Sequence, residues 1–457
     1  MLSRALACTA VLATVTPVHA DEPPPWRLGD ALGAPGWLTL GLEHRVRFEH
    51  LENDFRAMDP GDPTALVMRT LVRAEVEHAW LVAKIELLDA RAYASDDTPL
   101  NTTIVNPLDL LAGYAGIRLE GVVVDGDVLA VAMGRMTLDV GSRRLVARNE
   151  YRNTINAFTG VDVQWEDADE RALRAFAVMP VQRLPTDAEA LADNDLELDR
   201  EITDALLWGA FGAMPLGADV RVEGYVFGLH ERDADDAPSA NRQLITPGFR
   251  VLRAPAVRRL DVQLEAMLQL GTARASTASS ETEDLPVRAA SLHVSTGYTL
   301  DGAWQPRLSL AYDFASGDRD PTDDELERFD PLFGARRFEL GPTSLYGAIA
   351  RSNVSSPGVR VAVAPHARVE AFAAYRLVWL ASARDAWTTA GVRDPSGEAG
   401  SFVGQQIEAR VRWHAVPKNL ALELDVAYLR RGRFAREAPG TRDAPAAYIA
   451  AQLTATI

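Results

Sequence analysis

Cysteine is nearly absent from the 457-residue sequence, in which Cys8 is the only one. Because Cys8 lies in a segment that we expect to be cleaved, the mature chain has no disulfide, zinc–thiolate site or cysteine nucleophile. Beyond that segment the sequence also lacks any run of about 18 uninterrupted apolar residues, the length that a membrane-spanning helix needs. The mature chain is therefore expected to be either soluble and exported, or a closed barrel in a membrane.

Motifs of catalysis and of cofactor binding are missing from the sequence as well. The histidines do not follow the H-E-x-x-H spacing, and there is no G-x-S-x-G motif, phosphate-binding glycine loop or dinucleotide fingerprint. The segment that begins Asp318-Arg319-Asp320-Pro321 lacks the glycine and the final glutamate of a calcium-binding EF-hand loop. We predict no metal, no cofactor, no nucleic-acid partner and no enzymatic activity; a barrel-embedded enzyme acting on lipid or polysaccharide is the alternative.

The N-terminus has the three parts of a secretory signal peptide. Arg4 supplies the positive charge, residues 5–15 are apolar, and Val18-His19-Ala20 forms a small-residue cleavage site. We therefore predict a signal peptide over residues 1–20, a Pro- and Gly-rich periplasmic lead-in over 21–36, and a single barrel domain over 37–457.

From Trp37 onward, apolar and charged residues alternate with a period of two. Such alternation is typical of a strand that has one apolar and one polar face, and it occurs in membrane barrels as well as in soluble sandwiches. Opposed full charges at successive positions of the polar face favour the barrel, because they suit a water-filled lumen. In the first strand the apolar face is expected to consist of Leu38, Leu40, Leu42, Val46 and Phe48.

Segments of this kind recur to the end of the chain. They indicate an all-β fold, a transmembrane antiparallel β-barrel of about 18 strands (roughly 16–18), which is the size of a porin. Short turns alternate with long acidic linkers, such as 185–204 and 318–330, so we expect short periplasmic turns and long extracellular loops. After the first strand, strands are predicted over residues 66–80, 80–91, 110–119, 128–135, 159–165, 172–180, 205–214, 219–230, 259–270, 287–300, 305–314, 359–363, 368–380, 405–414, 420–429 and 447–457.

Lysine is rare too, with two lysines among 47 basic residues, so arginine carries nearly all positive charge. The densest arginine cluster lies in residues 134–165 and comprises Arg135, Arg143, Arg144, Arg148 and Arg152. Guanidinium groups bind carboxylate or phosphate in a bidentate manner, so this stretch predicts either a site for anions or a solvated, salt-bridged loop. Residue parity adds Arg45, Arg47, Arg69 and Arg73 to the polar face of the first two strands.

The same stretch resembles the alginate-export family of outer-membrane porins. That family carries a pattern close to G-R-Q-x-L-x-Y-G-D-x-R-L-V, then W-R-N-T, then F-D-G-V. The counterparts here are Gly134-Arg135, Leu138, Gly141, Arg144-Leu145-Val146, then Tyr151-Arg152-Asn153-Thr154, and Phe158-Thr159-Gly160-Val161. Further similar segments include Ala311 to Asp318, Tyr375 to Leu380, Asp385-Ala386-Trp387 and Arg430 to Phe434.

The resemblance implies a monomeric outer-membrane channel that passively exports an anionic polysaccharide, an alginate-like polyuronate, through an arginine-lined pore. The residues carried over as pore-lining are Arg135, Arg144 and Arg152. Membrane lipid, lipopolysaccharide and a periplasmic polysaccharide synthesis complex are the implied partners. Four positions depart from the pattern: Val140, Ser142, Asn156 and Thr159. For that reason a porin for small anionic solutes, such as sugar acids, is the alternative. The net charge of −17 argues against a surface that attracts anions everywhere, so we expect the acids on the outer loops and the arginines inside.

Overall fold

A computed structural model describes residues 25–57, 61–233, 239–278 and 280–457; the predicted signal peptide lies outside them. The strands are β1 (Leu38–Glu52), β2 (Thr64–His78), β3 (Leu81–Ala94), β4 (Asn106–Glu120), β5 (Val128–Met136), β6 (Phe158–Glu166), β7 (Ala172–Gln182), β8 (Arg200–Glu201), β9 (Ala205–Leu216), β10 (Val220–Glu231), β11 (Gln243–Arg253), β12 (Leu260–Ala273), β13 (Leu285–Thr299), β14 (Arg307–Ala315), β15 (Val354–His366), β16 (Val369–Trp379), β17 (Phe402–Val416), β18 (Leu420–Arg431) and β19 (Ala446–Thr456). The helices are short: α1 (Leu28–Leu32), α2 (Ala188–Asp193), α3 (Arg337–Leu340) and α4 (Phe434–Glu437).

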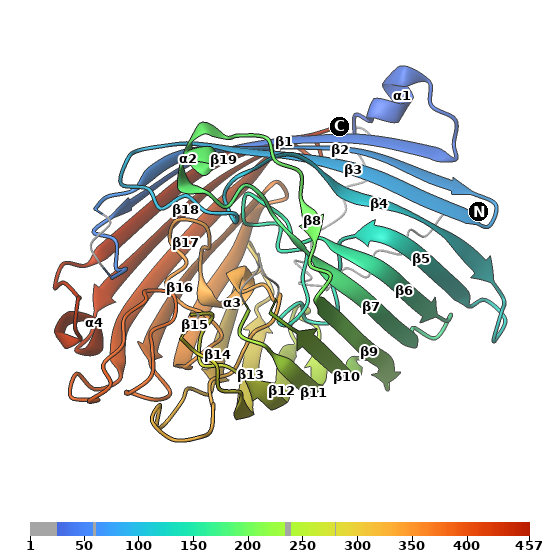
Figure 1. Cartoon of the computed structure of the whole chain (residues 1–457). Coiled ribbons are helices and arrows are strands. Elements are labelled where there is room, and N and C mark those ends of the chain that lie inside the picture. The colour runs from blue at the N-terminus through green and yellow to red at the C-terminus, as the bar shows by residue number, and fades with distance from the viewer. Residues whose placement is uncertain (1–24, 58–60, 234–238, 279) are drawn as a thin grey trace.

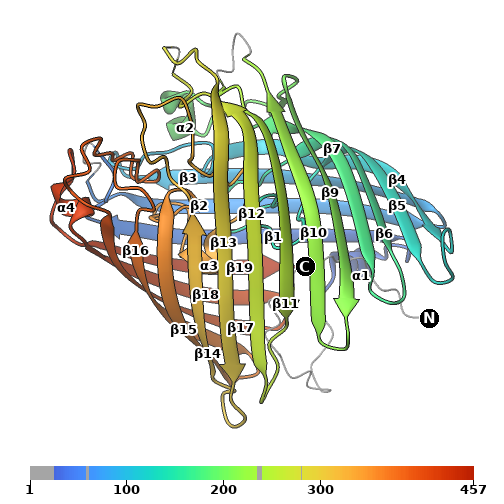
Figure 2. The same ribbon diagram turned by 90° about the horizontal axis from the view of Figure 1, so that it is seen from below.

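The strands close into one antiparallel barrel (Figures 1 and 2). Each long strand pairs with its neighbours along the chain, and β1 closes the ring by pairing with both β2 and β19. The two-residue strand β8 pairs only with the end of β7, while β7 itself continues to β9. The barrel therefore has 18 strands, which confirms the predicted fold class.

The charged and apolar residues that alternate in the sequence lie on opposite faces of the strands, the charged residues toward the lumen and the apolar residues on the outer surface. In β1 the side chains of Arg45, Arg47 and Glu49 are buried inside the barrel, whereas Phe48 is 45% exposed on the outside. Arg45 is paired in register with Arg69 of β2, so both lie on the inner face. The outer surface carries exposed apolar side chains on most of the long strands, which is the surface that a lipid environment requires.

This outer surface gives a first testable prediction. Leu424 lies near the middle of β18 and is 45% exposed on the outer face. Leu424→Arg is expected to lower the free energy of unfolding of the barrel by about 2–4 kcal/mol, because a charge would lie in the bilayer core. Equilibrium unfolding in vesicles measures the change. Leu424→Ala is the control; an equal loss for both variants would contradict a lipid-facing position.

The two rims of the barrel differ, as predicted. One rim carries short connections, such as His78 to Leu81, Leu216 to Val220 and Val416 to Leu420, whereas connections at the other rim are mostly longer. The short-turn rim also holds the start of β1 and the end of β19. The lead-in is tied to this rim, because the Trp26 backbone N–H donates to Asn419 Oδ1 at 2.8 Å.

Two of the long connections fold into the barrel. We call residues 137–157, between β5 and β6, the first inner loop, and residues 316–353, between β14 and β15, the second inner loop. They pair with each other through a parallel bridge from Val146 to Phe333 and a hydrogen bond from Ala335 N to Arg143 O at 2.8 Å. Helix α3 of the second inner loop lies inside the ring of strands (Figure 1).

No helix among the described residues has the length and hydropathy that crossing a membrane requires.

Candidate functional site

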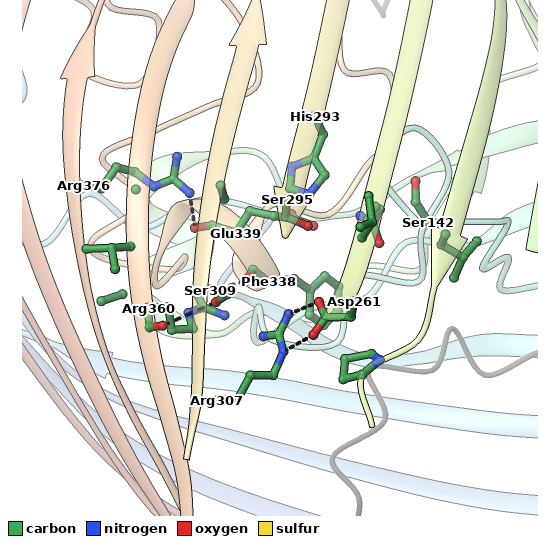
Figure 3. A pocket seen from close by; sticks show the side chains of 18 of the residues that line it. Ser142, Asp261, His293, Ser295, Arg307, Ser309, Phe338, Glu339, Arg360 and Arg376 are labelled. Atoms are coloured by element: carbon green, nitrogen blue, oxygen red, sulfur yellow. Dashed lines mark hydrogen bonds and ion pairs between the residues drawn. The ribbon is translucent and has the colours of Figure 1, made fainter. Parts of the chain in front are cut away.

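A cavity inside the barrel lies between the two inner loops and the inner faces of β11 to β17 (Figure 3). Its lining carries more positive than negative charge. Its acids are Asp261, Glu339 and Glu408. Its bases are seven arginines, Arg143, Arg144, Arg250, Arg253, Arg307, Arg360 and Arg376, and His293 also faces it.

Most of these arginines are paired with carboxylates of the wall or the loops. Arg307 donates through Nε to Asp261 at 2.9 Å, and Figure 3 shows the two side chains pointing toward each other. Arg376 lies 2.8 Å from Asp313, and Arg250 lies 3.1 Å from Glu223. Such pairs fix the positions of the guanidinium groups and leave less charge for a ligand.

Arg143 and Arg360 differ from the others in that neither forms an ion pair with a carboxylate of the described residues. Their guanidinium carbons lie over aromatic rings instead, Arg143 at 4.0 Å from the centroid of Phe338 and Arg360 at 4.4 Å from that of Phe372. Arg360 also donates to the Phe338 carbonyl at 3.1 Å. Stacking holds each group in place without neutralising it, so both charges remain available to an anion.

A tight turn of the first inner loop places Arg143 in the cavity. Gly141 and Arg143 both have left-handed backbone angles, with φ of 53° and 65°. A Cβ at position 141 would come within 2.9 Å of the Phe211 ring, so glycine is required there both for conformation and for space.

Arg144 follows this turn and connects the first inner loop to the barrel wall and to the second inner loop through ion pairs. It pairs with Glu265 of β12 and, at 2.7 Å, with Glu339 of the second inner loop. Burial would lower the pKa of Arg144, but Glu339 and Glu265 raise it above its usual value. Burial likewise would raise the pKa of Glu339, but Arg144 and Arg351 lower it. The pair therefore stays charged at physiological pH.

Arg45, Arg47 and Arg69 point into the barrel, as parity predicts, and hold the first inner loop. Arg45 donates to the carbonyl of Arg152 at 2.7 Å, and Arg69 to that of Glu150 at 2.8 Å. Arg47 donates to Glu49 at 2.8 Å and to the Tyr151 carbonyl at 2.7 Å. These groups donate to backbone carbonyls of the first inner loop and so anchor it to the barrel wall. A direct role in lining the pore stays a prediction for all three.

The other predicted site residues lie in three different settings. Arg73 lies on the inner face of β2, next to Gly41. Arg135 at the end of β5 pairs with Asp109 at 2.9 Å and Glu201 at 2.8 Å, which ties the barrel wall to the segment around β8. Arg152 has no ion pair with a described residue and lies close to two other arginines.

Three of the positions that depart from the family pattern form side-chain hydrogen bonds in the fold. The Ser142 hydroxyl donates to Glu265 at 2.8 Å, and Thr159 donates to Glu201 at 2.8 Å. Asn156 donates to the carbonyl of Phe333 at 3.2 Å and so links the two inner loops. The three substitutions therefore fit the local structure.

Sequence reasoning missed most of the arginines on the β11 to β17 wall. Arg307, Arg360 and Arg376 lie in or next to predicted strands, and parity within those strands was the signal that could have found them. Arg250 and Arg253 lie in β11, which was not predicted. Among the described residues, no group of histidine, cysteine and acidic side chains has the geometry of a metal site.

Comparisons with known proteins agree with this architecture. A family model described as alginate export matches residues 36–448. No curated protein matches the chain. Similar solved structures include Pseudomonas aeruginosa OccK8 (OprE), with a TM-score of 0.57, 10% identity, and coverage of 92% of this chain and 98% of that one. OccD3 (OpdP) of the same organism has a TM-score of 0.57 at 12% identity, over 92% and 91% of the two chains. P. aeruginosa OpdK, solved with vanillate, has a TM-score of 0.55 at 11% identity, over 92% and 98%.

Proposed function

The chain belongs to the alginate-export family, and we propose that this outer-membrane channel passes anionic solutes, above all an alginate-like polyuronate, through its arginine-rich cavity. The observation that supports the proposal is the charge of that cavity, where seven arginines meet three carboxylates in a chain whose net charge is −17. Positive charge thus outnumbers negative charge in the lining of this cavity, in a protein that is acidic as a whole. A cleft whose lining carries an excess of one sign raises the local concentration of ions of the opposite sign.

The arrangement of the arginines suits passage rather than tight binding. A conducting site must attract an ion and also release it, which requires several weak sites in series. Arg307, Arg376 and Arg250 are each partly neutralised by a carboxylate, so each offers an anion only a part of its charge. Carboxylates spaced along a polyuronate can move from one such guanidinium to the next.

A porin for small anionic solutes is the second candidate. It is favoured by the two inner loops, which occupy the barrel interior and narrow the route past the cavity. It is also favoured by one similar structure, OpdK, which was solved with vanillate, a small carboxylate. Both candidates use the same arginines, so the size of the permeant anion separates them.

Planar-bilayer recording of the purified, refolded protein tests the proposal. We expect a reversal potential that shows preference for anions, and block of the current by uronate oligomers at concentrations where neutral oligosaccharides have no effect. Block by sugar acids together with measurable flux of the monomer would favour the small-solute porin. A channel that prefers cations and ignores uronates would refute passage of uronates by either route.

The remaining parts of the proposal follow from membrane insertion. We propose that residues 1–20 are the cleaved signal peptide and that the short-turn rim, with the lead-in, faces the periplasm. The long loops then face outward, where they meet lipopolysaccharide. The barrel acts as a monomer without enzymatic activity, and in export it receives polymer from a periplasmic synthesis complex. A protein that hydrolyses lipid or polysaccharide when refolded would refute the absence of activity.

A further inference from the structure

Arg152 lies close to Arg183 and to Arg336, and the three arginines come from different loops. Arg152 belongs to the first inner loop, Arg183 follows β7, and Arg336 belongs to the second inner loop. We call them the three-arginine cluster. None of them lines the cavity described above.

Hydrogen bonds of the neighbouring residues fix this location. Arg183 donates through Nη1 to Asn156 Oδ1 at 2.9 Å, and Asn156 donates in turn to the Phe333 carbonyl at 3.2 Å. The carbonyl of Thr102 accepts both Arg183 Nε and the Thr154 hydroxyl, each at 2.8 Å. The loop after β7 is thereby joined to both inner loops.

Within the described residues, Arg152 and Arg336 of this cluster lack the carboxylate partners that several other arginines of the barrel interior have. Arg47, Arg144 and Arg337 each pair with at least one acid. The guanidinium groups of Arg152 and Arg336 form neither an ion pair nor a hydrogen bond with any described residue, and Arg336 Nε is fully buried without a partner. Both side chains are half-buried, and charges that are partly removed from water are normally paired, so these two groups can accept a negatively charged partner.

The electrostatics agree with the geometry. Burial, followed by the charges of Arg336 and Arg183, lowers the pKa of Arg152 to about 9. Burial, followed by Arg56 and Arg351, lowers the pKa of Arg336 to about 10. For Arg183, burial lowers the pKa and the nearby acid Asp199 raises it. Neighbouring arginines therefore disfavour the charge of Arg152 and of Arg336, and a bound anion would reverse this effect.

We propose that the three-arginine cluster binds a compact oxyanion, a carboxylate, sulfate or phosphate, which joins the loop after β7 to both inner loops. Guanidinium groups bind such anions with paired N–H donors, and here the donors come from three segments. The bound anion would stabilise the constricted form of the channel. This inference does not depend on what the channel transports, because the site holds the loops together whatever passes beside them.

The test is the thermal unfolding of the full refolded chain in detergent, monitored by the change in gel mobility that heating causes. Sulfate is added at low millimolar concentration, with ionic strength held constant by chloride. We expect a saturable rise of several degrees in the unfolding midpoint of the wild type, since a ligand that binds only the folded state stabilises it. General exclusion of sulfate from protein surfaces would raise the midpoint without saturation, and equally in all variants.

Arg152→Gln and Arg336→Gln, on separate loops, should each abolish the saturable rise. In chloride alone they should unfold at the wild-type temperature or above it, because repulsion is relieved. Arg148→Gln is the matched control on the first inner loop. Its partner is Glu86 at 2.8 Å, so this variant should unfold at a lower temperature and still respond to sulfate.

Galacturonate, compared with galactose, distinguishes the source of the anion. A larger shift with galacturonate would identify a sugar carboxylate as the ligand, and a larger shift with sulfate or phosphate an inorganic oxyanion; both results support the site. The absence of a saturable shift in the wild type, or an equal shift in Arg152→Gln and Arg336→Gln, would overturn it. Neither of these results would alter the reversal potential that tests anion passage.

Discussion

Replacing Arg143 and Arg360 together by glutamine is expected to remove most of the channel's preference for anions and to leave barrel stability unchanged. These guanidinium groups line the cavity, stack on Phe338 and Phe372, and form no ion pair with a described residue. A unit charge about 4 Å from a passing anion contributes roughly 1 kcal/mol even at the dielectric constant of water, so losing two should lower the anion-to-cation permeability ratio about tenfold or more.

Reversal potentials across a salt gradient give this ratio directly. Arg258→Gln is the control, since Arg258 lies in the short turn between β11 and β12 with its side chain 75% exposed. That variant should keep the wild-type ratio. If Arg143→Gln/Arg360→Gln also keeps it, selectivity is set elsewhere, and the paired arginines of the wall become the residues to replace.

Arg337→Met is expected to release the second inner loop and to increase the single-channel conductance. Arg337 is 5% exposed and donates to Glu408 at 2.6 Å and to Asp425 at 2.7 Å. Its guanidinium also lies 4.5 Å from the centroid of the Tyr151 ring, on the first inner loop. Removing it would leave two buried carboxylates without their cation, at a cost of about 3–5 kcal/mol. The structure relieves this cost most readily by moving the loop out of the lumen.

Histograms of single-channel conductance would show the released second inner loop as a larger and noisier open state. The triple variant Arg337→Met/Glu408→Gln/Asp425→Asn removes all three charges and should recover much of the lost stability, because a neutral site needs no cation. Arg433→Met, at the exposed arginine that precedes α4, is the control and should conduct as the wild type does. An unchanged conductance in Arg337→Met would show that the second inner loop is held mainly by other contacts.

The barrel could be predicted from sequence because each strand carries its own signal. Apolar and charged residues alternate within single strands such as β1, and the pairing of neighbouring strands follows from chain order. The one barrel strand without a predicted counterpart is β11. Its centre contains Pro247 and Gly248, which are typical of turns, and Tyr225 of β10 packs over Gly248. Only tertiary context makes that segment a strand.

The interior of the barrel was less predictable. The arginine density of residues 134–165 indicated either an anion site or a salt-bridged loop, and the structure contains elements of both. Arg148 is salt-bridged to Glu86, whereas Arg143 lines the cavity and forms no ion pair within the part of the chain that the structure describes. The partners of these arginines come from distant strands and from the second inner loop. Because a loop has no periodicity, the sequence contains no signal for its inward path or its contacts.

The seam between β1 and β19 has a consequence for how the barrel is assembled. Val46 of the first strand lies opposite Leu453 of the last, so this pairing joins segments separated by nearly the whole chain. Contacts of such high contact order form slowly, and until they form β1 offers an unpaired edge to any other strand. Ring closure must therefore wait for the last strand to arrive, and until then the edge of the first strand stays open to pairing with the wrong partner.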